Sequence, residues 1–178
     1  MRKIRVKAKK TEKPQEFFES KRKLTITGIA VAVILVIIGV FIYIENTDNK
    51  MVVNNNTDLK LEYVKAFFVG PEEAYNEGVN ITELGAGEKT VLPQEPINLF
   101  YAEANLEVRF KFEGYDELFV DAGYFNDNYS GKTSIDFAAD KDGNITLKVK
   151  AKPGIFANPR IECNERFTVN LAEGYVED

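Results

Sequence analysis

The sequence predicts an all-β fold, an immunoglobulin-like or jelly-roll β-sandwich, preceded by one transmembrane α-helix. Residues 24–44 form an apolar run without a charged residue, and this run predicts the helix. From residue 58 onward, apolar and polar residues alternate in eight or nine short runs that glycine and proline separate. Short alternating runs with no long helical pattern between them are typical of a β-sandwich.

The charges divide the chain into segments of opposite sign. Residues 1–23 contain ten of the 23 basic residues and three of the 28 acidic ones, whereas residues 24–44 contain none. Residues 45–178 therefore carry 13 basic and 25 acidic side chains, a net charge of −12, although the whole chain has −5. This asymmetry predicts a basic tail over residues 1–23. The Asn-rich residues 45–57 are expected to be a linker, and residues 58–178 the folded domain.

The apolar run has the length of a membrane span. Its 21 residues rise by about 1.5 Å each in a helix, so that they cover the roughly 30 Å of a hydrocarbon core. Bulky residues at the end of the run favour an uncleaved anchor over a signal peptide. Because Lys21, Arg22 and Lys23 precede the run, the N-terminus is expected in the cytoplasm and the C-terminal domain outside it, at the plasma membrane.

Two features of the membrane segment bear on partners. Gly28 and Ala32 are small residues spaced by four, which suits contact with a second helix, although small residues in an apolar span also explain them. The tail is too short and too polar to fold, and it is expected to interact with the lipid bilayer. No nucleic-acid partner is expected.

Several runs have the period-two pattern of half-buried antiparallel strands. Residues 105–113 (NLEVRFKFE) and 144–152 (NITLKVKAK) alternate strictly, and the apolar residues of 161–171 share one parity. Further strands are expected at residues 59–69, 79–84, 89–92, 97–101, 117–121 and 133–138.

Two connections between these strands have signatures of their own. Residues 133–151 are expected to form a hairpin around residues 141–144, where Asp142-Gly143 suits a tight turn. Residues 71–77, which begin with proline and precede Gly78, are the only stretch that favours one or two helical turns.

The segment from Asp121 to Gly131 is the strongest candidate for a ligand-binding site. It places aromatic rings, which stack on sugars, among Asn and Asp oxygens, which form hydrogen bonds or ligate calcium. The alternative is a well-packed loop whose aromatic residues fill one end of the sandwich. The candidate residues are Tyr124, Phe125, Asn126, Asp127, Asn128 and Tyr129.

Catalytic chemistry has little support in the sequence. The chain has no histidine, which removes Ser–His and Cys–His machinery. The single cysteine, Cys163, shares the apolar parity of its strand and is predicted to be a buried small hydrophobe. It can form neither an intrachain disulfide nor a Cys/His zinc site, and no metal or other cofactor is expected. Carboxylate pairs are the catalytic alternative that remains.

These observations favour a non-enzymatic binding module, anchored in the membrane, that contacts an extracytoplasmic protein or glycan. An exported domain without disulfides favours a bacterial envelope. One alternative is an accessory structural subunit of a membrane-embedded secretion, pilus or envelope assembly, in which the helix is itself a contact. The other alternative is a carboxylate-dependent hydrolase.

Overall fold

The computed structural model describes residues 14–47, 49–140, 144–154 and 157–177. Within these residues it contains one α-helix and eleven β-strands. The predicted all-β fold is confirmed, because the described strands form two sheets and the single helix lies near the N-terminus. The chain divides into two compact units, Met1–Phe41 and Ile42–Asp178.

Helix α1 (Pro14–Thr47) contains the apolar run. Its segment Lys23–Tyr43 is the one described helical segment that is long and apolar enough to cross a membrane. None of the side chains in that segment is buried within the protein. A membrane anchor and a signal sequence are the two roles that such a helix fits.

Sheet A has six strands in the order β11-β10-β8-β7-β1-β4. Neighbouring strands are antiparallel, except β1 and β7, which run parallel. The strands are β1 (Lys50–Asn56), β4 (Lys89–Pro93), β7 (Lys132–Ala139), β8 (Ile145–Lys152), β10 (Asn164–Asn170) and β11 (Tyr175–Glu177).

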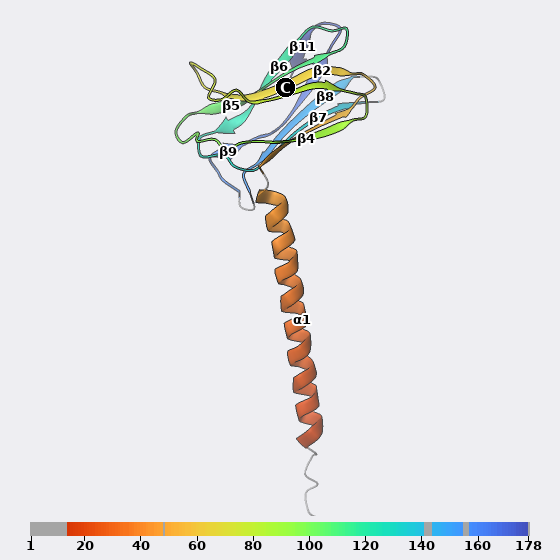
Figure 1. The fold of residues 1–178 in the computed structure, drawn as a ribbon, viewed down its shortest axis with the longest axis vertical. Helices are drawn as coiled ribbons and strands as arrows, with labels where there is room; N and C mark the ends of the chain where they lie inside the picture. Colours follow the sequence, from red (N-terminus) through yellow and green to blue (C-terminus); the bar gives the residue numbers. More distant parts are fainter. Residues whose placement is uncertain (1–13, 48, 141–143, 155–156, 178) are drawn as a thin grey trace, which may run out of the picture. The chain divides into compact units, whose positions relative to one another are not determined.

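Sheet B has five strands in the order β3-β2-β5-β6-β9, and all neighbours are antiparallel. The strands are β2 (Leu61–Val69), β3 (Val79–Leu84), β5 (Ala104–Phe112), β6 (Leu118–Phe125) and β9 (Ile161–Glu162). Figure 1 shows the strands of the two sheets as two layers.

The inner faces of the two sheets share one hydrophobic core. Phe137 of β7 contacts Phe110 and Phe112 of β5, with ring centroids 5.0 and 5.6 Å apart. The rings meet edge to face, an arrangement that aromatic pairs prefer. These contacts join sheet A to sheet B.

Strand β1 corrects the prediction of a linker over residues 45–57. Residues 50–56 pair with both β4 and β7, and Met51 and Val53 are buried in the core. The three consecutive apolar residues 51–53 belong to a strand that lies inside sheet A, with β7 on one side and β4 on the other. A protein that began at residue 58 would lack the strand that joins β4 to β7.

The Asn-rich composition of β1 does not indicate a linker, because one of its asparagines is a buried structural residue. Asn55 is fully buried, and its Nδ2 donates hydrogen bonds to the backbone oxygens of Leu59, Leu84 and Gly85. Its Oδ1 accepts a hydrogen bond from Thr57 Oγ1 at 2.7 Å. Buried amides of this kind are satisfied by backbone partners.

Most of the other expected strands are confirmed, but two expectations are wrong. Residues 97–101 form no strand: only Ile97 pairs, with Tyr129, as an isolated bridge. Residues 71–77 form no helical turn: they are mostly bends, and Ala74 pairs with Val69 as an isolated bridge. The hairpin of residues 133–151 is confirmed by the pairing of β7 with β8, whereas residues 141–143 of its turn lie outside the described residues.

The chain crosses from sheet B to sheet A at Cys163, because β9 pairs with β6 and β10 pairs with β8. Cys163 is buried there, as its parity predicts, and burial raises the pKa of its thiol to about 12. The crossing presses against Gly123 of β6: a Cβ on Gly123 would lie 2.4 Å from Cys163 Cβ. Only glycine fits this approach.

Gly123 also reverses the alternation of β6. Its φ is +72°, and the register between β5 and β6 shifts at this level. Before the glycine, Asp121 is exposed and Ala122 is buried. After it, Tyr124 is exposed and Phe125 is buried, so that one irregular residue decides which aromatic ring faces solvent.

Gly123→Ala is expected to lower the free energy of unfolding by roughly 3 kcal/mol, because a left-handed backbone costs about 1–2 kcal/mol and crowding against Cys163 adds about 1–3 kcal/mol. The matched control is Gly114→Ala, where φ is +82° and a Cβ would meet nothing within 4 Å, so that only the backbone term applies. Urea unfolding of the full-length protein in detergent measures both. Equal losses would contradict the crowding at Cys163.

Candidate functional site

The outer face of sheet B combines aromatic, acidic and basic side chains. Strands β2, β5 and β6 place these residues outward because the intervening residues are buried in the core. We name this surface the Arg109 face. Its members are Tyr63, Lys65, Phe67, Glu107, Arg109, Glu117, Phe119, Asp121 and Tyr124.

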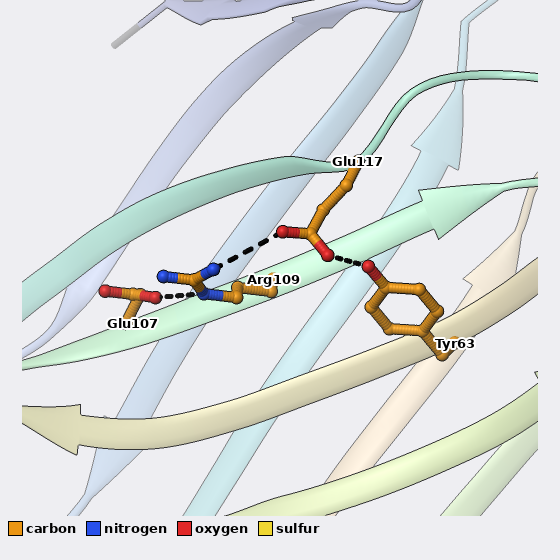
Figure 2. Close-up of polar contacts among 4 residues, drawn as sticks. All are labelled: Tyr63, Glu107, Arg109 and Glu117. Carbon is orange, nitrogen blue, oxygen red and sulfur yellow. Dashed lines mark hydrogen bonds and ion pairs between the residues drawn. The ribbon is translucent and has the colours of Figure 1, made fainter. Parts of the chain in front are cut away.

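Arg109 is held between two carboxylates, as Figure 2 shows. Its Nε donates to Glu107 Oε1, and its Nη1 donates to Glu117 Oε1 at 3.4 Å. The second oxygen of Glu117 accepts a hydrogen bond from the Tyr63 hydroxyl. A guanidinium that is bonded to two carboxylates has one defined orientation. The centre of the face is therefore ordered in the absence of any bound molecule.

Aromatic rings lie on both sides of Arg109. The guanidinium carbon is 5.7 Å from the ring centroid of Phe119 and 5.8 Å from that of Phe67. Lys65 Nζ lies 4.9 Å from the Phe67 centroid. Phe119 is 55% exposed and Tyr124 is 42% exposed, so that large ring surfaces remain open to solvent beside the charged network. A shallow depression of about 500 Å³ adjoins Tyr63, Phe67 and Arg109.

Asp121 lies opposite Glu107 in the register of β5 and β6. Partial burial raises the pKa of Asp121, the negative charge of Glu107 raises it further, and Arg109 lowers it. The two residues are carboxylates at facing positions of neighbouring strands. Glu107, however, is already bound by Arg109.

The structure separates the aromatic residues that the sequence predicts as ligand-binding. Tyr124 belongs to the Arg109 face, and its hydroxyl accepts a hydrogen bond from Asn126 Nδ2 at 2.7 Å. Phe125 and Tyr129 are in the core, 0% and 1% exposed. Both rings pack edge to face on Phe68, with centroids 5.0 and 5.7 Å away. For these two residues the alternative, a packed end of the sandwich, is what the structure shows.

Polar groups of the same loop form hydrogen bonds within the loop and with residues 158–160. Asp127 accepts hydrogen bonds from Asn158 Nδ2 at 3.1 Å and from the backbone N of Asn128 at 2.8 Å, and these bonds lower the pKa of its carboxyl. The backbone N of Asn126 donates to the oxygen of Arg160 at 2.8 Å. Among the residues that the structure describes, no group of three His, Cys, Asp or Glu side chains is placed to hold a metal ion.

The two small residues of the helix are both on α1 and exposed. A Cβ on Gly28 would meet nothing within 4 Å, and Ala32 lies one turn further along. The spacing predicted for a second helix is therefore present on the surface of α1.

Sequence reasoning missed most of the Arg109 face. The outward parity of Glu107 and Arg109 is visible in the alternation of residues 105–113. Phe119 and Tyr63 come from other strands, and alternation fixes which face a residue occupies but not which strand lies next to it. The signal that the sequence offered is Phe119, which lies between two apolar residues of an expected strand and therefore on its outward face.

Comparisons with known proteins add little. No protein-family model matches the sequence, and no curated protein matches it. An NMR structure of a protein from Eubacterium rectale resembles the chain with a TM-score of 0.37 and 12% identity, over 64% of this chain and 94% of that one. At this TM-score the likeness supports no statement about fold or function.

Asp121→Asn is expected to stabilise the domain at pH 7 by less than about 1 kcal/mol, because the exposed carboxylate is screened by water. The folded pKa is raised, so the ionised Asp121 destabilises the folded state, and this penalty disappears below the ordinary pKa of 3.8. Thermal unfolding between pH 3 and pH 7 measures the gain, which should shrink as the pH falls. A gain that grows at low pH would contradict the assignment.

Tyr129→Phe removes a hydroxyl that bonds Thr133 Oγ1 at 2.9 Å in the core, and it leaves that buried group without its partner. It is expected to cost about 1–2 kcal/mol of unfolding free energy. Tyr124→Phe removes an exposed hydroxyl and should change stability by less than about 0.5 kcal/mol. Denaturant unfolding of both variants compares them. A harmless Tyr129→Phe would argue against a structural role for this ring.

Proposed function

We propose that this chain is a single-pass membrane protein whose extracytoplasmic β domain is a non-enzymatic binding module. The Arg109 face is its recognition surface, and the partner that it fits is a protein of the cell envelope. The observation that carries the proposal is the pairing of exposed Phe119 and Tyr124 with an arginine that carboxylates already hold in place. Arginine and aromatic side chains dominate the binding energy of protein interfaces.

The order of the face before binding supports the same role. Fixing a long arginine side chain costs about 0.5–1.5 kcal/mol when it happens on association. Here Glu107 and Glu117 fix it in the free protein, and Tyr63 fixes Glu117 in turn. A partner that packs on Phe119 therefore meets a surface that does not have to rearrange.

Membrane anchoring is supported by α1 and by the charges that flank its apolar segment. Ten basic residues precede or begin that segment, and Glu45 and Asp48 follow it. By the positive-inside rule, this distribution supports a cytoplasmic N-terminus and a β domain on the other side of the membrane. The lone buried Cys163 and the absence of any disulfide partner in the sequence fit a bacterial envelope.

Binding rather than catalysis is supported by the chemistry of the face. The sequence has no histidine, and Glu107, which lies opposite Asp121, forms an ion pair with Arg109. We further propose an immunoglobulin-like or jelly-roll arrangement of the sandwich. What supports it is two largely antiparallel sheets on one core, with a chain that crosses between them at Cys163.

The test is photocrosslinking in intact cells that make the full-length protein. A photoreactive residue in place of Phe119 is expected to give a discrete adduct with one envelope protein, and one in place of Thr168 on sheet A is not. Arg109→Ala should reduce the adduct at least tenfold because it removes the ordered centre of the face, whereas Lys60→Ala, whose ion pair with Glu83 is exposed, should leave it unchanged. Protease added outside the cells must remove the β domain.

The outcomes separate the proposal from its rivals. Equal adducts from positions 119 and 168 would contradict a recognition surface on sheet B. If replacing residues 24–43 by an unrelated apolar helix abolishes the adduct, the protein is an accessory subunit of a membrane assembly, and Gly28 and Ala32 become its contacts. A β domain that resists external protease would contradict the orientation.

A further inference from the structure

The outer face of sheet A is basic, although the region that contains it is acidic. Residues 45–178 carry 13 basic and 25 acidic side chains. More than half of those basic residues lie at outward strand positions of sheet A, where their neighbours in sequence are buried or edge residues. We name this surface the lysine face. Its members are Lys50, Lys89, Lys132, Lys148, Lys150, Lys152 and Arg166.

The register of sheet A places these like charges directly opposite one another. Lys132 lies opposite both Lys50 and Lys152. Lys148 lies opposite Arg166 on β10 and opposite Asp136 on β7. Like charges at facing strand positions destabilise a sheet. With 25 acidic residues in 45–178, opposite charges at more of these positions were available. The repulsion therefore points to a role in which positive charge itself is needed.

On the Arg109 face of the same domain, carboxylates neutralise a basic side chain. There Arg109 contacts Glu107 and Glu117. On the same strand as Arg109, Lys111 Nζ lies 2.7 Å from Glu62 Oε2. On the lysine face, apart from Lys50, no member forms an ion pair with a carboxylate within the described residues. The acidic residues at outward positions there are Asp136, which accepts a hydrogen bond from Asn54 Nδ2, and Glu177 on the edge strand.

The positive charges form a strip and not a point. Lys148, Lys150 and Lys152 follow one another along β8 at alternate positions, which are about 6.6–6.8 Å apart in a strand. Lys132 and Arg166 flank them on the adjacent strands, about 4.7–4.9 Å away. A shallow depression of about 240 Å³ adjoins Lys148 and Arg166, and the carboxylates Asp136 and Asp140 also line it. Such a strip matches a linear chain that carries repeated negative charges.

Polar side chains without charge lie between the lysines. Ser134 and Asn164 are both opposite Lys150, and Thr146 precedes Lys148 at the next outward position of β8. Hydroxyl and amide groups at such places form hydrogen bonds with the hydroxyls of a sugar. Among the exposed rings of the domain, Phe100, Tyr101 and Phe119 are not on the strands of sheet A, and Tyr175 is on its edge strand β11.

We infer that the lysine face binds a linear acidic polysaccharide. A membrane surface is disfavoured because insertion into lipid uses large apolar and aromatic side chains, and the central strands β7 and β8 expose none. Single-stranded nucleic acid is disfavoured because its binding relies on aromatic platforms, which these strands also lack. The inference goes beyond the protein-recognition role of the Arg109 face and does not depend on it, because the two surfaces are on different sheets.

The test is lysine footprinting of the full-length protein in neutral nanodiscs at 150 mM salt, with heparin as the acidic polysaccharide. An acetylating reagent modifies exposed lysines, and mass spectrometry reads each lysine separately, so the basic tail does not obscure the result. Heparin is expected to protect Lys132, Lys148, Lys150 and Lys152 at least tenfold. Lys60 and Lys65, which are outside the lysine face, should change less than twofold.

A pair of matched variants tests the cause. In Lys148→Gln/Lys150→Gln, the heparin concentration that half-protects Lys132 and Lys89 is expected to rise about tenfold. In Lys60→Gln/Arg160→Gln, which removes the same charge elsewhere, it should stay within twofold. Both double variants must keep the unfolding midpoint of the wild type, because the replaced side chains are not in the core.

Three results would overturn the inference. Absence of protection on the lysine face is one, and equal protection of Lys60 and Lys65 is another, since it would mean general attraction by charge. The third is equal protection by vesicles of phosphatidylcholine and phosphatidylglycerol at the same concentration of negative charge, which would identify a membrane surface as the partner. None of these results bears on crosslinking from position 119.

Discussion

The packing of Phe137 between Phe110 and Phe112 is the constraint on which the rest of the domain depends. It joins a strand of sheet A to a strand of sheet B, and the buried alternate residues of both sheets surround it. Because each strand alternates, every residue that enters this core sends its neighbours outward. The core thus determines the composition of two outer surfaces at once.

Those two surfaces differ in how their charges are treated. On sheet B, acidic and basic side chains neutralise one another around Arg109 and leave aromatic rings exposed. On sheet A, lysines face lysines across the strands. One domain therefore presents an ordered, nearly neutral surface and a largely positive one. Surfaces of such different chemistry attract different classes of partner, and neither has to be rebuilt when the other is occupied.

The sequence predicts a strand well where all residues on one of its faces are apolar and those on the other are polar. Residues 105–113 and 144–152 alternate without exception, and both are strands. The prediction fails where a local feature overrides the pattern. Residues 50–56 look like a polar linker, because nothing in the sequence shows that Asn55 is buried by backbone partners. Tyr124 and Phe125 cannot be assigned to opposite faces without the irregular residue Gly123.

The candidate surfaces were harder to predict than the strands because they are built across strands. The parity of Lys148, Lys150 and Lys152 is visible in the sequence, but their proximity to Lys132 and Arg166 depends on pairing that only the fold supplies. Strand β1 is the clearest case of pairing between residues far apart in the sequence. Its parallel neighbour β7 begins 82 residues after it, with Lys132 opposite Lys50. During synthesis, β1 cannot pair with β7 until residues 132–138 have been made, which is most of the chain. The β domain thus completes sheet A late in synthesis, after the strands β7, β8, β10 and β11 have been made.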